Sequence, residues 1–142
     1  MSKKAILCLD DERIILTSLR DQLFCSFGDR YIYEFAESIE EAWEVIKELQ
    51  QAGIKIVLVV SDWLLTKKRE DNFLFEVKHK FPSTVIILLT GQADNEKVEP
   101  IKHYYYVHDC LVKPWDTINL ITIVQSGIEQ IDLEKSECLG GK

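Results

Sequence analysis

The chain has 142 residues, 46% of them hydrophobic, and a formal net charge of −7 at pH 7. These values predict one globular domain with a short appendage, and the acidic charge argues against direct binding to nucleic acid. No apolar stretch reaches the ~20 residues of a membrane-spanning helix, so we expect no membrane association. The four cysteines lack Cys-x-x-Cys spacing and the N-terminus lacks a signal-peptide pattern, which together predict a reduced, cytoplasmic protein without disulfides or a zinc site.

The first third of the chain alternates between expected strands and helices. Residues 4–9 form an apolar strand, and Asp11 is expected to cap the helix that follows. Residues 31–36 have the alternating polarity of a second strand. Ser38 and Glu41 then form a capping box, which predicts the start of a second helix.

The third expected strand is the apolar run 56–60, which leads through Ser61 to Asp62. A short, fully apolar run is typical of a strand that is buried on both faces of a parallel sheet. A charged loop begins at Thr66. A helix then starts near Phe73, and Pro82 closes it.

The last third of the chain continues the alternation. Residues 85–89 and 110–112 have the pattern of two further strands. Between them, the polar stretch 92–99 predicts a helix that is short or kinked, because Pro100 interrupts it. A final helix is expected to begin near Ile118.

Five strands that alternate with helices predict an α/β fold. We expect a doubly wound, five-stranded parallel sheet in the order 2-1-3-4-5, with helices on both faces. This domain should cover residues 1–131, with residues 132–142 as a helical extension or linker. Apolar residues from Ile121 to Ile131 recur with coiled-coil spacing, and the helix should outrun the sheet by Ile131. We therefore expect the helix to continue past Ile131 and to meet a partner, either a second copy or a following domain.

Polar residues stand at the carboxyl ends of the expected strands. Asp10 and Asp11 end the first strand and Asp62 the third, while Thr90 and Lys113 end the fourth and fifth. These ends line the crevice where open parallel sheets bind their ligands. An aspartate there can attack phosphorus to form an aspartyl phosphate, and clustered carboxylates suit Mg²⁺. A hydroxyl and an ammonium group could bind the phosphoryl oxygens.

Four short motifs at these positions carry a family resemblance. They are Leu9-Asp10-Asp11-Glu12, Val60-Ser61-Asp62-Trp63, Leu89-Thr90-Gly91-Gln92 and Val112-Lys113-Pro114-Trp115. In this order, each at a strand end, they resemble the receiver domains of bacterial two-component response regulators, from residue 4 to about residue 130. The resemblance implies a flavodoxin-like fold and a phosphoprotein that a histidine kinase phosphorylates on Asp62.

The resemblance also implies a magnesium site. Asp11, Asp62 and the backbone carbonyl of Leu64 would bind Mg²⁺, and Asp10 would act largely through water. The metal would offset negative charge on the group being transferred. Mg²⁺ is therefore the one cofactor that we expect.

The remaining expectations concern the switch itself. Lys113 would pair with the phosphoryl group, Thr90 would hydrogen-bond it on activation, and the bond before Pro114 would be cis. We expect Lys113 to behave as a surface residue in folding, so that its loss changes stability little. The protein would not be an enzyme, beyond assisting its own phosphorylation and dephosphorylation. Its partners would be a histidine kinase or phosphotransfer protein, together with a second copy or an output domain beyond residue 142, which could be enzymatic.

The sequence departs from the family pattern at three positions. Thr66 and approximately Glu70 replace a proline and a glycine in the loop after the phosphoacceptor. Cys110 replaces the family's switch aromatic residue. We therefore expect one of the tyrosines at 104–106 to cover the pocket beside Thr90.

Three other functions compete with a phosphoryl-accepting switch. A phosphorylation-independent receiver-like interaction module would also have this fold, and Cys110 keeps it in contention. A phosphatase of the haloacid dehalogenase class would need a second aspartate where Leu64 stands. A flavodoxin-type electron carrier would need a phosphate-binding loop after the first strand, and the sequence there lacks the Ser/Thr/Gly-rich pattern.

Overall fold

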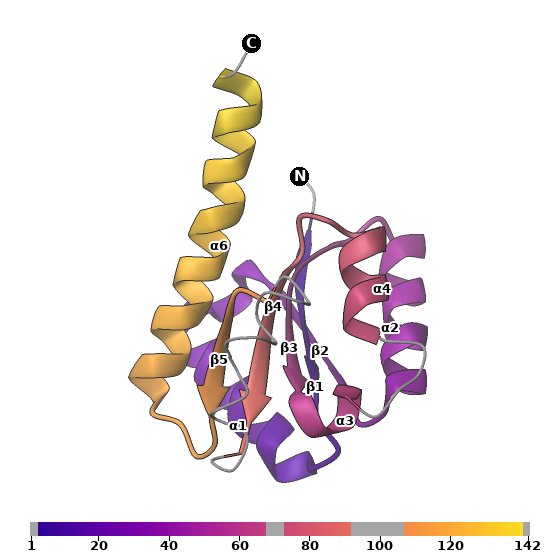
Figure 1. Ribbon diagram of the computed structural model, residues 1–142, viewed down its shortest axis with the longest axis vertical. Helices are drawn as coiled ribbons and strands as arrows, with labels where there is room; N and C mark the ends of the chain where they lie inside the picture. Colours follow the sequence, from indigo (N-terminus) through magenta and orange to yellow (C-terminus); the bar gives the residue numbers. More distant parts are fainter. Residues whose placement is uncertain (1–2, 68–72, 92–106, 141–142) are drawn as a thin grey trace.

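The computed structural model describes residues 3–67, 73–91 and 107–140. Within these ranges five strands form one parallel sheet in the order β2-β1-β3-β4-β5. They are β1 (Lys4–Leu9), β2 (Ile32–Ala36), β3 (Lys55–Asp62), β4 (Val85–Thr90) and β5 (Asp109–Val112). The predicted fold class and strand order are therefore confirmed, and the carboxyl ends of the strands share the lower edge of the sheet in Figure 1.

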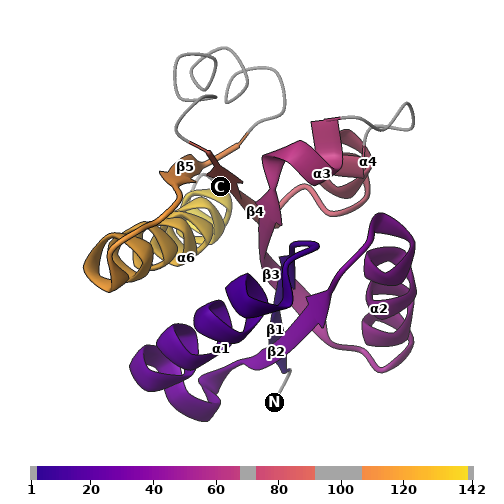
Figure 2. The same cartoon turned by 90° about the horizontal axis from the view of Figure 1, so that it is seen from below.

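Helices cover both faces of this sheet. They are α1 (Arg13–Phe27), α2 (Ile39–Gln51), α3 (Trp63–Lys67), α4 (Phe73–Lys80) and α6 (Thr117–Gly140), with a short 3-10 helix η1 (Gly28–Arg30). Figure 2 shows α1 and α6 on one face and α2, α3 and α4 on the other. Each pair of long helices closes its own apolar cluster against the sheet, so the sheet is buried on both sides.

The central strands are apolar because both of their faces are covered. Every residue of β4 is buried, and in β3 only Lys55 is not. Cys8 in β1 is fully buried, and burial raises the pKa of its thiol to about 12. This cysteine is therefore a small, unreactive core residue, as its apolar neighbours in the sequence suggested.

The start of α2 matches its prediction, whereas the start of α1 does not. The Ser38 hydroxyl accepts a hydrogen bond from the Glu41 N–H at 3.1 Å, as in a capping box. The Glu41 carboxylate accepts the N–H of Glu37, one residue before the N-cap, at 2.7 Å. The expected cap on α1 is wrong: Asp11 is exposed, and Glu12 occupies the N-cap position without a side-chain cap. The reason lies one residue earlier, because the buried Asp10 carboxylate accepts the Glu12 N–H at 2.8 Å.

The short helix α3 was not predicted, since a charged loop was expected from Thr66 onward. It begins directly after β3, and the Asp62 carboxylate accepts the Leu65 N–H at 3.1 Å. An aspartate that accepts the N–H three residues later acts as a helix N-cap. The side chain at the end of β3 thus starts the helix that follows it.

Helix α6 continues past Ile131, as predicted, and ends at Gly140. Its 24 residues span about 36 Å, and Figure 1 shows it extending beyond the sheet. The expectation that the Ile131 side chain outruns the sheet is wrong, because it is 5% exposed within the apolar cluster between α1, α6 and the sheet. A partner for the helix beyond Ile131 stays a prediction. The eight residues of β3 extend about 26 Å, more than the ~21 Å of helix from Thr117 to Ile131, so the sheet still covers that position.

Several expectations fall outside the described residues. They concern the Glu70 position, the helix expected over residues 92–99 with its interruption at Pro100, and the tyrosines at 104–106. Within the described ranges, no helix combines the length and apolar character needed to cross a membrane.

Candidate functional site

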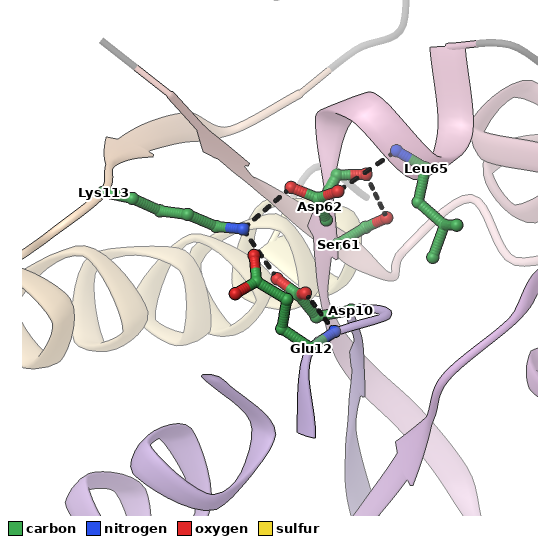
Figure 3. Close-up of polar contacts among 6 residues, drawn as sticks. All are labelled: Asp10, Glu12, Ser61, Asp62, Leu65 and Lys113. Atoms are coloured by element: carbon green, nitrogen blue, oxygen red, sulfur yellow. Dashed lines mark hydrogen bonds and ion pairs between the residues drawn. The ribbon is translucent and has the colours of Figure 1, made fainter. Parts of the chain in front are cut away.

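Polar residues from four strand ends lie at the carboxyl edge of the sheet. Asp10 follows β1, Asp62 ends β3, Thr90 ends β4 and Lys113 follows β5. The parallel register places Leu9 beside Ser61 and Asp62 beside Leu89, which brings the two aspartates to one level. In Figure 3 the Lys113 ammonium points between the carboxylates of Asp10 and Asp62.

Lys113 bridges two buried carboxylates. Its Nζ donates to Asp10 Oδ2 at 2.9 Å and to Asp62 Oδ1 at 3.0 Å. Asp10 is fully buried and Asp62 is 4% exposed, while the Lys113 side chain retains 20% of its exposure. The expectation that Lys113 behaves as a surface residue is therefore wrong, because it supplies the cation that two desolvated anions require.

The other oxygen of each carboxylate accepts a backbone N–H. Asp10 Oδ1 accepts from Glu12 at 2.8 Å, and Asp62 Oδ2 accepts from Leu65 at 3.1 Å. Sequence reasoning missed both donors. A capping pattern could have found Leu65, since it stands three residues after an aspartate at a strand end. These bonds orient both carboxylates before any ligand arrives.

Burial and charge pairing have opposing effects on the pKa values of Asp62 and Lys113. Burial is the largest effect on the Asp62 carboxyl and raises its pKa, and the charge of Asp10 raises the pKa further. The hydrogen bond and charge of Lys113 and the Leu65 N–H lower the pKa, but the net result is a raised value. Burial lowers the pKa of Lys113, but its bonds to Asp10 and Asp62 and their charges outweigh this, so the net pKa is raised. The carboxylates thus hold the lysine in its charged form, while burial makes the charge on Asp62 costly.

Thr90 is a buried residue at the end of β4, next to Lys113 in the sheet. The residue is 1% exposed, and its Oγ1 has no hydrogen-bond partner among the described residues. The Lys113 N–H donates to the Thr90 carbonyl at 2.8 Å, which fixes the two residues next to each other. A buried hydroxyl without a partner is unfavourable, so this group is available to a ligand that brings oxygen acceptors.

The donor set fits a hard divalent cation. Asp10, Asp11 and Asp62 each offer a carboxylate oxygen, and these atoms all lie within 4.8 Å of one another. Asp11 is exposed and the other two are buried, so the cluster opens to solvent on one side. All-oxygen ligands with room for water are what Mg²⁺ prefers. Leu64 lies in α3, directly after Asp62 and Trp63, and the ligand role of its carbonyl stays a prediction.

Two further expectations concern β5 and its end. The Lys113–Pro114 peptide bond is cis, as predicted. Cys110 is half-buried and packs against the apolar cluster on the α2 and α4 face. Its N–H donates to Asp109 Oδ1 at 2.8 Å.

The chain is similar over nearly its whole length to solved receiver domains. The signal receiver domain of an HD domain-containing protein from Pseudomonas fluorescens Pf-5 is 25% identical, with a TM-score of 0.74, over 93% of this chain and 98% of that one. A response regulator receiver domain protein from Clostridium thermocellum is 24% identical, with a TM-score of 0.75, over 92% and 98%. A structure named adenylate cyclase from Rhodopirellula baltica is 24% identical, with a TM-score of 0.77, over 100% of each chain.

No protein-family model matches the chain, and no curated protein matches it. The two receiver domains named above nevertheless share its fold over 98% of their own length. The resemblance predicted from the four strand-end motifs is therefore confirmed.

Proposed function

We propose that this receiver-like chain is a phosphoryl-accepting switch of a two-component system, acting in the bacterial cytoplasm. The carrying observation is Asp62, a desolvated carboxylate held between the Lys113 ammonium and the Leu65 N–H. An oxygen of Asp62 would attack the phosphorus of a phosphohistidine on a histidine kinase or phosphotransfer protein. The P–N bond would break as the aspartyl P–O bond forms, and the donor histidine would leave as neutral imidazole after taking up a proton.

Mg²⁺ would be held by Asp11, Asp62 and the Leu64 carbonyl, with Asp10 acting through water. When bound, the ion supplies charge neutralisation for phosphoryl transfer. Three carboxylates already share the site with one lysine, so an added phosphoryl group needs this second cation. The proposal therefore includes a requirement for Mg²⁺ in phosphorylation.

The response would start from Lys113 and Thr90. A phosphoryl group adds a charge of about −1.5 to −2 and three acceptor oxygens. Lys113 would exchange a carboxylate partner for a phosphoryl oxygen, and the Thr90 hydroxyl would donate to another. Because these residues end β4 and β5, the change would bias the conformation of both strand ends and reach a downstream output domain or partner. The chain would catalyse only its own phosphorylation and dephosphorylation.

The test is intact-mass measurement after incubation with acetyl phosphate and Mg²⁺, and then with a histidine kinase. The wild type should gain one phosphoryl group, chelation should prevent this, and Asp62→Asn should gain none. Asp29→Asn is a matched control, because it removes an exposed aspartate in η1 away from the site. Equal labelling of Asp62→Asn would refute the assignment, and an unlabelled wild type under every donor would favour a phosphorylation-independent module.

A further inference from the structure

A second surface feature lies away from the carboxylate cluster, between α1 and the edge strand β2. It is a cavity of about 360 Å³ lined by Arg20, Asp21, Phe24, Cys25, Tyr33 and Phe35. Figure 2 shows α1 and β2 side by side at one end of the sheet. Since β2 is an outer strand of the sheet, this groove faces outward from the domain.

The floor and wall of this α1–β2 groove are aromatic. Phe24 is 55% exposed, while Tyr33 and Phe35 are partly buried against the cluster beneath α1. The Phe24 and Tyr33 rings meet edge to face with centroids 6.1 Å apart. The Tyr33 hydroxyl donates to the Gly28 carbonyl at 2.7 Å, which anchors that ring at the end of α1. The groove is thus a preformed apolar surface.

The rim of the groove carries one cation and one anion that are adjacent in sequence. Arg20 and Asp21 are paired at 3.3 Å, with side-chain exposures of 57% and 65%. An exposed pair at this distance is weak and can exchange partners at little cost. The rim is also neutral, whereas the chain as a whole has a charge of −7 and its copies repel one another on average.

From this combination we propose that the α1–β2 groove is the surface through which two copies of this chain associate about a twofold axis. A twofold interface requires one patch that complements itself. Here Arg20 of each copy would pair with the partner's Asp21, twice, around a centre of Phe24 and Cys25. An apolar centre within a polar rim is the usual composition of such an interface. A basic or acidic partner would meet repulsion from one of the two rim charges.

This inference does not depend on phosphorylation, because the groove lies on the second half of α1, away from the carboxylates that precede its first turn. It also differs from the coiled-coil association expected of α6, where Ile131 is buried within the chain. A result on self-association therefore leaves the role of Asp62 to its own labelling experiment.

Charge exchange on the full chain tests the proposal. We expect sedimentation equilibrium over a wide concentration series to show a reversible dimer for the wild type. Arg20→Asp and Asp21→Arg should each weaken it at least about tenfold, because each puts like charges across the interface. An equimolar mixture of the two variants should associate again, since each rim then meets its opposite.

Phe24→Asp should also weaken the dimer at least about tenfold, whereas Phe75→Asp should not. Phe75 is a matched control, because it is 51% exposed and lies on α4, on the opposite face of the sheet. A wild type that is monomeric at all concentrations would overturn the proposal. So would a dimer that survives both single charge reversals, or a variant mixture that fails to associate although each variant gives a wild-type circular dichroism spectrum.

Discussion

A buried threonine stands at each end of β4, and the two hydroxyls differ in their hydrogen bonding. Thr84 immediately precedes the strand and Thr90 ends it, and each is 1% exposed. The Thr84 hydroxyl donates to the Ile56 carbonyl at 2.7 Å, whereas the Thr90 hydroxyl has no partner within the described ranges. Burial alone therefore does not determine whether a hydroxyl has a hydrogen-bond partner among the described residues. At the amino end the hydroxyl is a structural donor, whereas at the carboxyl end no described residue accepts a hydrogen bond from the hydroxyl.

Charged side chains also differ between the carboxyl edge of the sheet and the amino end of β4. At the carboxyl edge, two buried carboxylates share one partly exposed lysine. Near the amino end, Lys78 Nζ donates to the Thr84 carbonyl at 2.7 Å, so a cation there bonds a backbone oxygen. Desolvated charge costs stability, and at the carboxyl edge a bound cation could offset part of that cost. Removing individual groups at each end tests this contrast.

The largest effect is expected for Lys113→Met, which leaves Asp10 and Asp62 buried without their cation. We expect a loss of about 2–3 kcal/mol in the free energy of unfolding at pH 7, in urea with chelator present. This loss is at or below the lower limit of the ~3–5 kcal/mol expected when one partner of a fully buried ion pair is removed. The Lys113 side chain is 20% exposed, so solvent weakens the effect. Lys47→Met, which alters an exposed lysine on α2, should change stability by no more than about 0.5 kcal/mol.

The pH dependence sharpens this prediction. The pKa of Asp62 is raised above its ordinary value of 3.8, so the folded chain binds that proton more tightly than the unfolded chain does. The cost of the ionised carboxylate is therefore absent below pH 3.8 and grows as pH rises through the folded-state pKa. Lys113→Met removes two causes that lower this pKa, so the variant's deficit should shrink on acidification. A deficit that stays constant from pH 7 to acid would contradict the electrostatic account.

An intermediate effect is expected for Thr84→Val at the amino end. The substitution keeps the shape of the side chain but removes the donor to the Ile56 carbonyl. We expect a loss of about 1–2 kcal/mol in the free energy of unfolding, with unchanged phosphorylation. Thr122→Val, at an exposed position on α6, is the matched control and should have little effect. Equal stability of Thr84→Val and wild type would show that the hydroxyl is no structural donor.

Much of the fold could be predicted from the sequence because burial on both faces leaves a simple pattern. The apolar run ending at Asp62 and the capping box at Ser38 both appear where they were expected. Residues at strand ends were also brought together as predicted, since parallel register fixes which ends are neighbours. The convergence of Asp10, Asp62 and Lys113 required only the strand order.

The errors arose where a side chain had two potential uses. Asp11 was expected to cap α1, but the neighbouring Asp10 bonds the Glu12 N–H, and Asp11 faces solvent in the acidic cluster. Lys113 was expected to behave as a surface lysine, because sequence alone does not show that its two acceptors are buried. Local patterns name the residues of such a site, whereas the distribution of hydrogen bonds among them depends on tertiary packing.

The smallest change in stability is expected for Thr90→Val, and its sign should oppose that of Thr84→Val. Replacing a buried hydroxyl that has no partner among the described residues by a methyl group removes a desolvation cost, so the free energy of unfolding should stay level or rise by up to about 1 kcal/mol. Under the proposed function, Asp62 should still accept a phosphoryl group by intact mass. Yet the amide NMR shifts of β5 and α6 should no longer respond to acetyl phosphate, because the hydroxyl that would contact the new group is missing. Thr90→Ser keeps the hydroxyl and should restore the response. If Thr90→Val instead loses as much stability as Thr84→Val, the two ends of β4 do not differ and Thr90 is a structural donor like its counterpart.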